Sequence, residues 1–138
     1  MRQDTDFLGN WKVARSIEDR FSNQVGRFVG VAQFSHAADD TLLYKETGEI
    51  QLEQGPTMNA TRSYIWYFAD NQIDVFFEDG RPFHSFIADG KVAGTDHPCG
   101  DDYYTVAYDF LEWPCWLAIW TVKGPRKDYT SSSTYLRE

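Results

Sequence analysis

Hydrophobic and polar side chains alternate along most of the chain, and turn residues recur at short intervals. In the first such segment, Trp11, Val13, Arg15 and Ile17 fall on one face, and polar side chains occupy most of the other. A period of two is typical of strands with one buried face. The pattern predicts about nine or ten strands in consecutive hairpins. The longer ones are expected near residues 9–17, 27–35, 42–52, 62–68, 73–77, 103–110, 115–123 and 129–137.

Helical spacing is nearly absent from the chain. It occurs at Ser16–Asn23, where Ile17, Phe21 and Val25 are spaced as on one helix face, so one short helix is predicted after the first strand. Closing a meander of hairpins removes its exposed edges, and no linker or repeat divides residues 1–138. We therefore predict one all-β domain, a single closed antiparallel up-and-down β-barrel.

Two turn signals set the register of the central strands. Asp79-Gly80 and Asp89-Gly90 are typical two-residue hairpin turns, since glycine tolerates the positive φ that these turns demand. Pairing across them collects apolar side chains, one arginine and two histidines on one face. A pure core would exclude such polar groups, whereas a ligand pocket places a few of them on apolar walls. The predicted pocket face comprises Arg62, Tyr64, Trp66, Phe68, Val75, Phe77, His84, Phe86 and His97.

The densest run of reactive side chains is Asp96–Tyr104, with one histidine, one cysteine, three carboxylates and two phenols. Adjacent side chains on an extended chain point in different directions, and zinc sites usually take a second pair of ligands from elsewhere. We therefore predict no metal and no cofactor. The simpler interpretation is a tight strand connection, with an unusual φ at Gly100 and backbone amides bonded by Asp102. Within this run, the side chains predicted to form one wall of the pocket are His97, Cys99, Asp102 and Tyr104.

Two kinds of chemistry stay open for these side chains. His84 or His97 could act as a general base. The partner would be Tyr104 or Asp102, although hydrogen-bonded structural histidines are commoner. Cys99 could act as a nucleophile with His97 as its base, but no oxyanion loop is recognisable and an inert thiol is the default.

The two arginines predicted to face inward, Arg15 and Arg62, need partners because a buried charge must be compensated. A ligand carboxylate would suit a guanidinium group. An internal acid, for which Glu46 and Asp109 are candidates, would suit it equally well. Structural pairing and ligand binding are therefore equal alternatives.

Charge narrows the choice of partners. The 21 acidic and 13 basic residues give a net charge of −8, and no basic stripe is visible. Nucleic acids and anionic membrane surfaces are therefore disfavoured. The first residues form neither a leader nor a membrane span, so a cytoplasmic protein is expected. Cys99 and Cys115 would lie about 30 Å apart on the predicted strands, which favours free thiols in a reducing compartment.

The predicted hairpin from Tyr103 to Lys123 is apolar on both faces. One face would look into the barrel, and the other needs a cover, such as a helix, a chain terminus or a second copy of the chain. A homodimer through an outer face between Tyr104 and Leu117 is one such arrangement. In the predicted register, the face that contains Tyr104 also contains Val106, Tyr108, Leu117 and Ile119.

Two sets of motifs suggest a family. Gly9-Asn10-Trp11 resembles the Gly-x-Trp signature of lipocalins, which implies that Trp11 plugs the barrel base under Arg137 or, less favourably, Arg126. The chain also resembles, over nearly its whole length, an uncharacterised family of small lipocalin-like, calycin-type barrels. The resemblance implies a barrel of the lipocalin or fatty-acid-binding type and no known activity. Its motifs are Phe7-Leu8-Gly9-x-Trp11, His97-x-Cys99-Gly100-x-Asp102-x-Tyr104 and Trp120-x-Val122-x-Gly124-Pro125-x-Lys127-Asp128-Tyr129.

Three functional hypotheses follow. The leading one is binding of a small, mostly hydrophobic ligand with a polar or carboxylate head inside the barrel. The second is a small enzyme of isomerase, cyclase or lyase type that uses the histidines in the same cavity, by analogy with other barrels. The third is a protein-interaction module that uses an aromatic outer face. The residues predicted to bind ligand are Arg15, Arg62, Tyr64, Trp66, Phe77, His84, Phe86, His97, Cys99, Asp102 and Tyr104.

Overall fold

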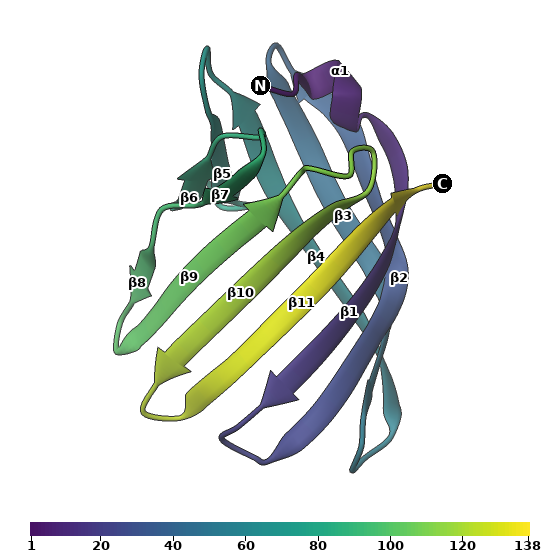
Figure 1. The fold of residues 1–138 in the computed structure, drawn as a ribbon, viewed down its shortest axis with the longest axis vertical. Coiled ribbons are helices and arrows are strands. Elements are labelled where there is room, and N and C mark those ends of the chain that lie inside the picture. The colour runs from purple at the N-terminus through teal and green to yellow at the C-terminus, as the bar shows by residue number, and fades with distance from the viewer.

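The computed structural model describes residues 1–138 as one antiparallel sheet of eleven strands, curled into a barrel, with one helical turn at the N-terminus (Figure 1). The elements are α1 (Asp4–Phe7), β1 (Gly9–Asp19), β2 (Gln24–Ala38), β3 (Thr41–Leu52), β4 (Thr57–Phe68), β5 (Ile73–Phe77), β6 (Pro82–Phe86), β7 (Lys91–Ala93), β8 (His97–Cys99), β9 (Asp102–Asp109), β10 (Trp116–Gly124) and β11 (Lys127–Arg137). The all-β up-and-down barrel predicted from the alternating pattern is confirmed.

The sheet is nearly closed. Its order is β6-β5-β4-β3-β2-β1-β11-β10-β9-β7, with β8 also paired to β9, so the first and last strands of the chain pair with each other. Between β6 and β9 no strand pairing completes the ring. The segment after β7 bridges this gap: the Thr95 amide donates to the Ser85 carbonyl oxygen at 2.9 Å, and the Gly94 amide donates to the Val106 carbonyl oxygen at 3.0 Å.

The helical turn lies before the first strand, not after it, which corrects the prediction for Ser16–Asn23. Residues 16–19 continue β1 and are paired on both sides, with β2 and β11. The chain then turns, and the Asp19 carboxylate accepts hydrogen bonds from the Phe21 and Ser22 amides at 3.0 and 3.2 Å. Two ladders of hydrogen bonds outweigh an isolated helical turn, which has an unfavourable nucleus.

Figure 1 shows α1 at one end of the barrel. Aromatic rings fill this end of the interior. Trp11 is fully buried, and its indole nitrogen donates to the Phe7 carbonyl oxygen at 2.8 Å. The Arg137 guanidinium lies over the Trp11 ring at 3.9 Å and donates to the carbonyl oxygens of Leu8 and Asp6. The predicted Trp11 plug with Arg137 above it is therefore confirmed, and it closes this end.

Two glycines let β2 and β3 approach an aromatic ring. Gly30 pairs directly with Gly48, without a bulge at that point. A Cβ atom on Gly48 would lie 2.3 Å from the Val29 carbonyl oxygen and 2.7 Å from the Phe28 ring. The Phe28 ring therefore packs over the two glycines and lines the interior.

The register of the β9–β10 hairpin differs from the predicted one by one residue. Tyr108 pairs with Ala118 and Tyr104 pairs with Val122. Because a one-residue shift moves a strand's side chains to the opposite face, Tyr104, Val106 and Tyr108 point inward with Trp116 and Trp120, not outward with Leu117 and Ile119. The outer face proposed for a homodimer therefore lacks Tyr104, Val106 and Tyr108, while Leu117 and Ile119 stay on the outside. The side chains that line the interior from β9 and β10 are Tyr104, Tyr108, Trp116, Ala118, Trp120 and Val122.

Cys99 is exposed, Cys115 is half-buried, and the two thiols are not bonded to each other. No helix in the structure has the length and hydropathy of a membrane span.

Candidate functional site

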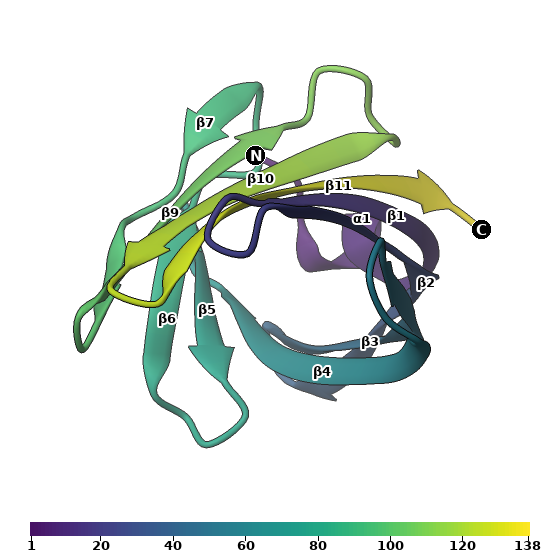
Figure 2. The ribbon, with the colours of Figure 1, turned by 90° about the horizontal axis from the view of Figure 1, so that it is seen from below.

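The barrel contains a cavity of about 840 Å³ that opens at the end opposite α1. Figure 2, seen from below, shows the strands surrounding this end and α1 lying behind them. Of its 31 lining residues 20 are hydrophobic. A cavity of this size with a few polar groups on apolar walls is typical of small-molecule sites.

The lining is arranged in layers because each strand runs along the barrel. Trp116 and Tyr135 lie toward the plugged end, while Asp19, Leu52 and Arg81 lie at the mouth. Between these layers β1, β3 and β4 place Arg15, Glu46 and Arg62. Alternation puts every second side chain of each strand inside, so a polar layer crosses an otherwise aromatic cavity.

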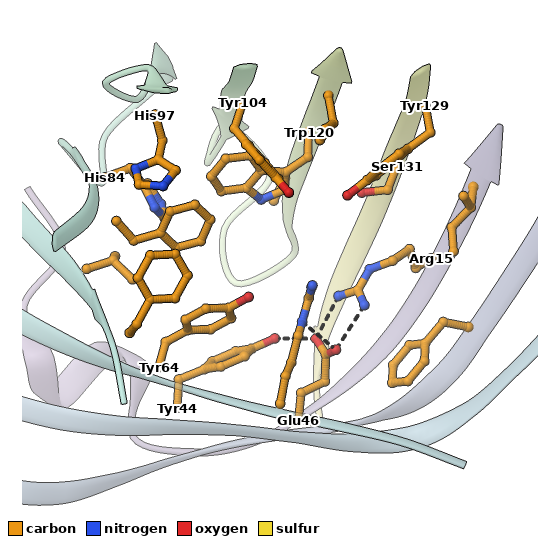
Figure 3. A pocket seen from close by; sticks show the side chains of 18 of the residues that line it. Arg15, Tyr44, Glu46, Tyr64, His84, His97, Tyr104, Trp120, Tyr129 and Ser131 are labelled. Carbon is orange, nitrogen blue, oxygen red and sulfur yellow. Dashed lines mark hydrogen bonds and ion pairs between the residues drawn. The ribbon is translucent and has the colours of Figure 1, made fainter. Parts of the chain in front are cut away.

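A buried ion cluster forms that polar layer (Figure 3). Arg15 donates from both terminal nitrogens to the Glu46 carboxylate at 2.9 and 2.6 Å, and from Nε to the Ser133 hydroxyl at 2.6 Å. Arg62 approaches the same carboxylate through Nε at 3.0 Å. Glu46 is 2 % exposed and Arg15 8 %, whereas the Arg62 side chain is 43 % exposed and faces the cavity.

The charges of the cluster support one another. Burial opposes ionisation of Glu46, but the hydrogen bonds from Arg15 and the charge of Arg62 outweigh it and hold the Glu46 pKa below its ordinary value. Burial also disfavours the charged form of Arg15, but bonding to Glu46 raises its pKa above the ordinary value. Two cations therefore share one anion, and the layer carries one excess positive charge.

Two phenols extend the cluster toward the plugged end. The Tyr44 hydroxyl donates to Glu46 Oε1 at 2.5 Å, and the hydroxyls of Tyr44 and Tyr135 are 3.0 Å apart. Since Tyr44 uses its proton on Glu46, Tyr135 is the donor in this second bond. Burial raises the pKa of both phenols, so both stay protonated.

His84 lies deeper in the apolar part of the cavity. Its Nε2 atom is 2.8 Å from the Tyr108 hydroxyl, and its ring is 6 % exposed. Burial, with a smaller effect of His97, lowers the pKa of His84 from 6.5 to about 3, so the ring is neutral. Its Nδ1 atom and the indole nitrogen of Trp116 are both buried without a hydrogen-bond partner.

The Asp96–Tyr104 stretch is a tight hairpin at the edge of the mouth, as the simpler interpretation of the sequence predicts. β8 pairs with β9 so that His97 faces Tyr104 and Cys99 faces Asp102, and Gly100 has a φ of +61° in the turn. Asp102 forms an ion pair with Lys127 at 3.4 Å, so the prediction that it bonds backbone amides is wrong. No group of three or more His, Cys, Asp and Glu side chains is arranged to hold a metal ion.

Most of the residues predicted to bind a ligand share this cavity. Phe86 does not line it: it is 3 % exposed and stacks behind Tyr108 with ring centroids 4.0 Å apart, nearer the plug. Asp102 does not line it either, because it lies beyond the rim beside Gly124 and Lys127. The predicted residues that line the cavity are Arg15, Arg62, Tyr64, Trp66, Phe77, His84, His97, Cys99 and Tyr104.

Several lining residues were missed by the predicted pocket face. Phe83 enters the cavity because the β5–β6 pairing shifts between Val75 and Phe76, so Phe83 and His84 both line it. The predicted register separated Trp120 from Tyr104, whereas the observed pairing brings both side chains into the cavity. Tyr44 could have been found from the sequence, since it lies two residues before Glu46 on the same face.

The fold and the cavity define a class: a lipocalin-like barrel, plugged at one end and open at the other to an internal, mostly apolar cavity. Residues 7–137 match the model of DUF6314, a family of unknown function, and the chain belongs to that family. A search of curated proteins finds no match.

Two solved structures share the fold at low sequence identity. An S-type phycobiliprotein lyase, CPES, from Guillardia theta superposes with a TM-score of 0.72 at 10 % identity, covering 98 % of this chain and 90 % of that one. A redesigned β-barrel, mFAP1, bound to DFHBI gives a TM-score of 0.51 at 14 % identity, covering 99 % of this chain and 100 % of that one.

Proposed function

We propose that the protein binds a small, flat, mostly apolar molecule inside the barrel and holds an anionic group of that molecule against Arg62. The observation that carries this proposal is the cluster of two guanidinium groups and one carboxylate in an apolar cavity. Ligand binding is thus the function that the geometry supports best.

Arg62 is the group available to the ligand. All the nitrogens of Arg15 are used, on Glu46 and Ser133. Arg62 contacts Glu46 through Nε and makes no hydrogen bond to the protein from its two terminal nitrogens. A guanidinium with two free parallel donors suits a carboxylate, and a low-dielectric cavity with excess positive charge favours an anion.

The walls favour a flat molecule. Phe83 stacks between Phe77 and Trp120, with ring centroids 4.6 and 4.9 Å apart and interplanar angles of 22° and 12°. Both faces of Phe83 are covered, so a planar, conjugated ligand would stack on the outer face of Phe77 or of Trp120, both of which line the cavity. The redesigned barrel bound to DFHBI is an example of a similar fold that holds a small molecule.

The geometry gives less support to acid–base catalysis. His84 has a pKa of about 3 and is a weak base. Its partner is Tyr108, while Asp102 is engaged with Lys127. His97 and Tyr104 have ring centroids 5.9 Å apart and form no hydrogen bond with each other.

The proposal is tested with a matched pair of probes, anthracene-2-carboxylate and anthracene-2-carboxamide, by isothermal titration calorimetry. We expect tighter binding of the acid, and Arg62→Met should weaken acid binding by roughly 10- to 100-fold with little effect on the amide. Arg81→Met is the control, since Arg81 lines the mouth but is paired with Asp79 at 2.7 Å. Equal binding of the two probes by the unmodified protein, or an unchanged acid affinity in the Arg62 variant, would refute the proposal.

A further inference from the structure

Two phenols lie on the cavity wall formed by β9, β10 and β11. Tyr104 and Tyr129 both pair with Val122, one from each side, and all three side chains line the cavity. Strands about 4.8 Å apart place the two tyrosine Cα atoms roughly 10 Å from each other. In Figure 3 both hydroxyl groups point away from their strands, into the cavity. The phenols therefore face the space that a ligand would fill.

Both hydroxyl groups can donate to a ligand. Tyr129 is half-buried, yet its hydroxyl makes no hydrogen bond in the protein and stays accessible. The Tyr104 hydroxyl accepts a hydrogen bond from Lys127 Nζ at 3.1 Å, at an exposed position. An ammonium group only donates, so the proton of Tyr104 is left without an acceptor. A ligand atom can therefore accept from both phenols without breaking an internal bond.

The surrounding groups keep the phenols protonated and this arrangement fixed. Bonding to Tyr104 raises the pKa of Lys127, so the ammonium group stays charged. Burial raises the pKa of Tyr129, and Tyr104 adds to this effect, so Tyr129 is neutral near pH 7. Lys127 is itself paired with Asp102 at 3.4 Å. The phenol pair therefore offers hydrogen bonds with little excess positive charge.

Two charged groups lie near the phenol pair. Arg62 is close enough to act on Tyr129, whose pKa its charge lowers against the larger effect of burial. Asp19 pairs with Tyr129 across β1 and β11 and lines the mouth. The hydrogen bond from the Ser22 hydroxyl lowers the pKa of Asp19, so this carboxylate is ionised. It would repel a second anion beside Tyr129 but not a neutral acceptor.

We infer that Tyr104 and Tyr129 bind a neutral carbonyl-type oxygen of the ligand, next to the anionic group held by Arg62. The ligand is then an acid with a carbonyl oxygen close to its carboxylate, and its flat apolar part fills the rest of the cavity. This inference rests on the proposed function and adds to it. A carbonyl oxygen has two lone pairs and no proton, so it can accept from both phenols at once.

The test compares 9-fluorenone-1-carboxylate with fluorene-1-carboxylate by isothermal titration calorimetry. The two acids share a ring system and a charge, and the first has a carbonyl oxygen beside its carboxylate. We expect the ketone acid to bind about tenfold more tightly or better, as one or two added hydrogen bonds would give. In 9-fluorenone-4-carboxylate the two groups are far apart, so its preference over fluorene-4-carboxylate should be much smaller.

Tyr104→Phe and Tyr129→Phe should each reduce the preference for the 1-substituted ketone acid several-fold. Their affinity for fluorene-1-carboxylate should be nearly unchanged, which also shows that the variants are folded. Tyr103→Phe is the matched control. It removes a hydroxyl from the adjacent residue of β9, where that hydroxyl donates to Asp96 outside the cavity, and should keep the preference.

Three results would overturn the inference while leaving the Arg62 anion site intact. They are equal affinity of the unmodified protein for the two 1-carboxylates, an unchanged preference in both phenol variants, and an equal preference for the ketone in the 4-carboxylate pair. Failure of every one of these acids to bind would overturn both proposals.

Discussion

Replacing Glu46 with Gln should strongly destabilise the protein. The substitution keeps the shape of the side chain but removes the only anion that compensates Arg15, which is 8 % exposed and donates twice to it. It also weakens the bond from Tyr44. Breaking a buried pair by removing one partner costs about 3–5 kcal/mol, which is a large part of the roughly 5–15 kcal/mol that stabilises a domain.

The measurement is urea unfolding followed by tryptophan fluorescence, with the free energy of unfolding extrapolated to water. Glu49→Gln is the control, because Glu49 is exposed on the same strand, and it should change the free energy of unfolding by less than about 0.5 kcal/mol. The double variant Arg15→Met, Glu46→Leu should recover most of the lost stability, since apolar replacement of a buried pair is often neutral or better. A Glu46→Gln protein as stable as the control would refute the assignment of a buried ion cluster.

Three further outcomes are expected. His84 has a pKa of about 3 in the folded protein against 6.5 in the unfolded chain, so below pH 6.5 the unfolded chain binds more protons. The free energy of unfolding should therefore fall as the pH drops, by about 2 kcal/mol at pH 5. His84→Gln should remove this part of the pH dependence, as measured by urea unfolding at several pH values. Gly48→Ala would place a Cβ atom 2.3 Å from the Val29 carbonyl oxygen and should lower the free energy of unfolding by about 1–3 kcal/mol; an unchanged urea midpoint would contradict the close approach. Arg137→Met removes the cation over Trp11 and the hydrogen bonds to the carbonyl oxygens of Asp6 and Leu8. It should lower the free energy of unfolding by about 1–3 kcal/mol, seen as a lower Tm in calorimetry. An unaltered Tm would show that Arg137 over Trp11 does not stabilise the protein.

The alternation of hydrophobic and polar residues was sufficient to predict the barrel architecture. Period-two alternation depends on the geometry of a single strand, so the inward positions of Arg15, Arg62 and Trp66 followed from the chain itself. The same holds for Glu46, one of two acids predicted to pair with the inward arginines. The Trp11 plug under Arg137 came from a resemblance, and the structure agrees with it.

Relations between strands were decided by the tertiary structure. The loop between Phe110 and Trp116 folds against Phe7 and Trp11, and that packing sets which residues of β9 and β10 pair. The register shift at Val75 likewise turns Phe83 into the cavity. Neither register can be predicted from the neighbouring residues, because the same turn sequence is compatible with loops of several lengths.

The alternating sequence by itself therefore determined that the chain forms a barrel, which faces of β1 and β4 are buried, and that charged groups lie inside. The tertiary structure decided which aromatic residues meet across the cavity and which buried donors have no partner. The physical reason is that the face of a side chain depends on its position in one strand, whereas its neighbours depend on the register between strands, and a shift of one residue in a turn reverses the face of every residue that follows it.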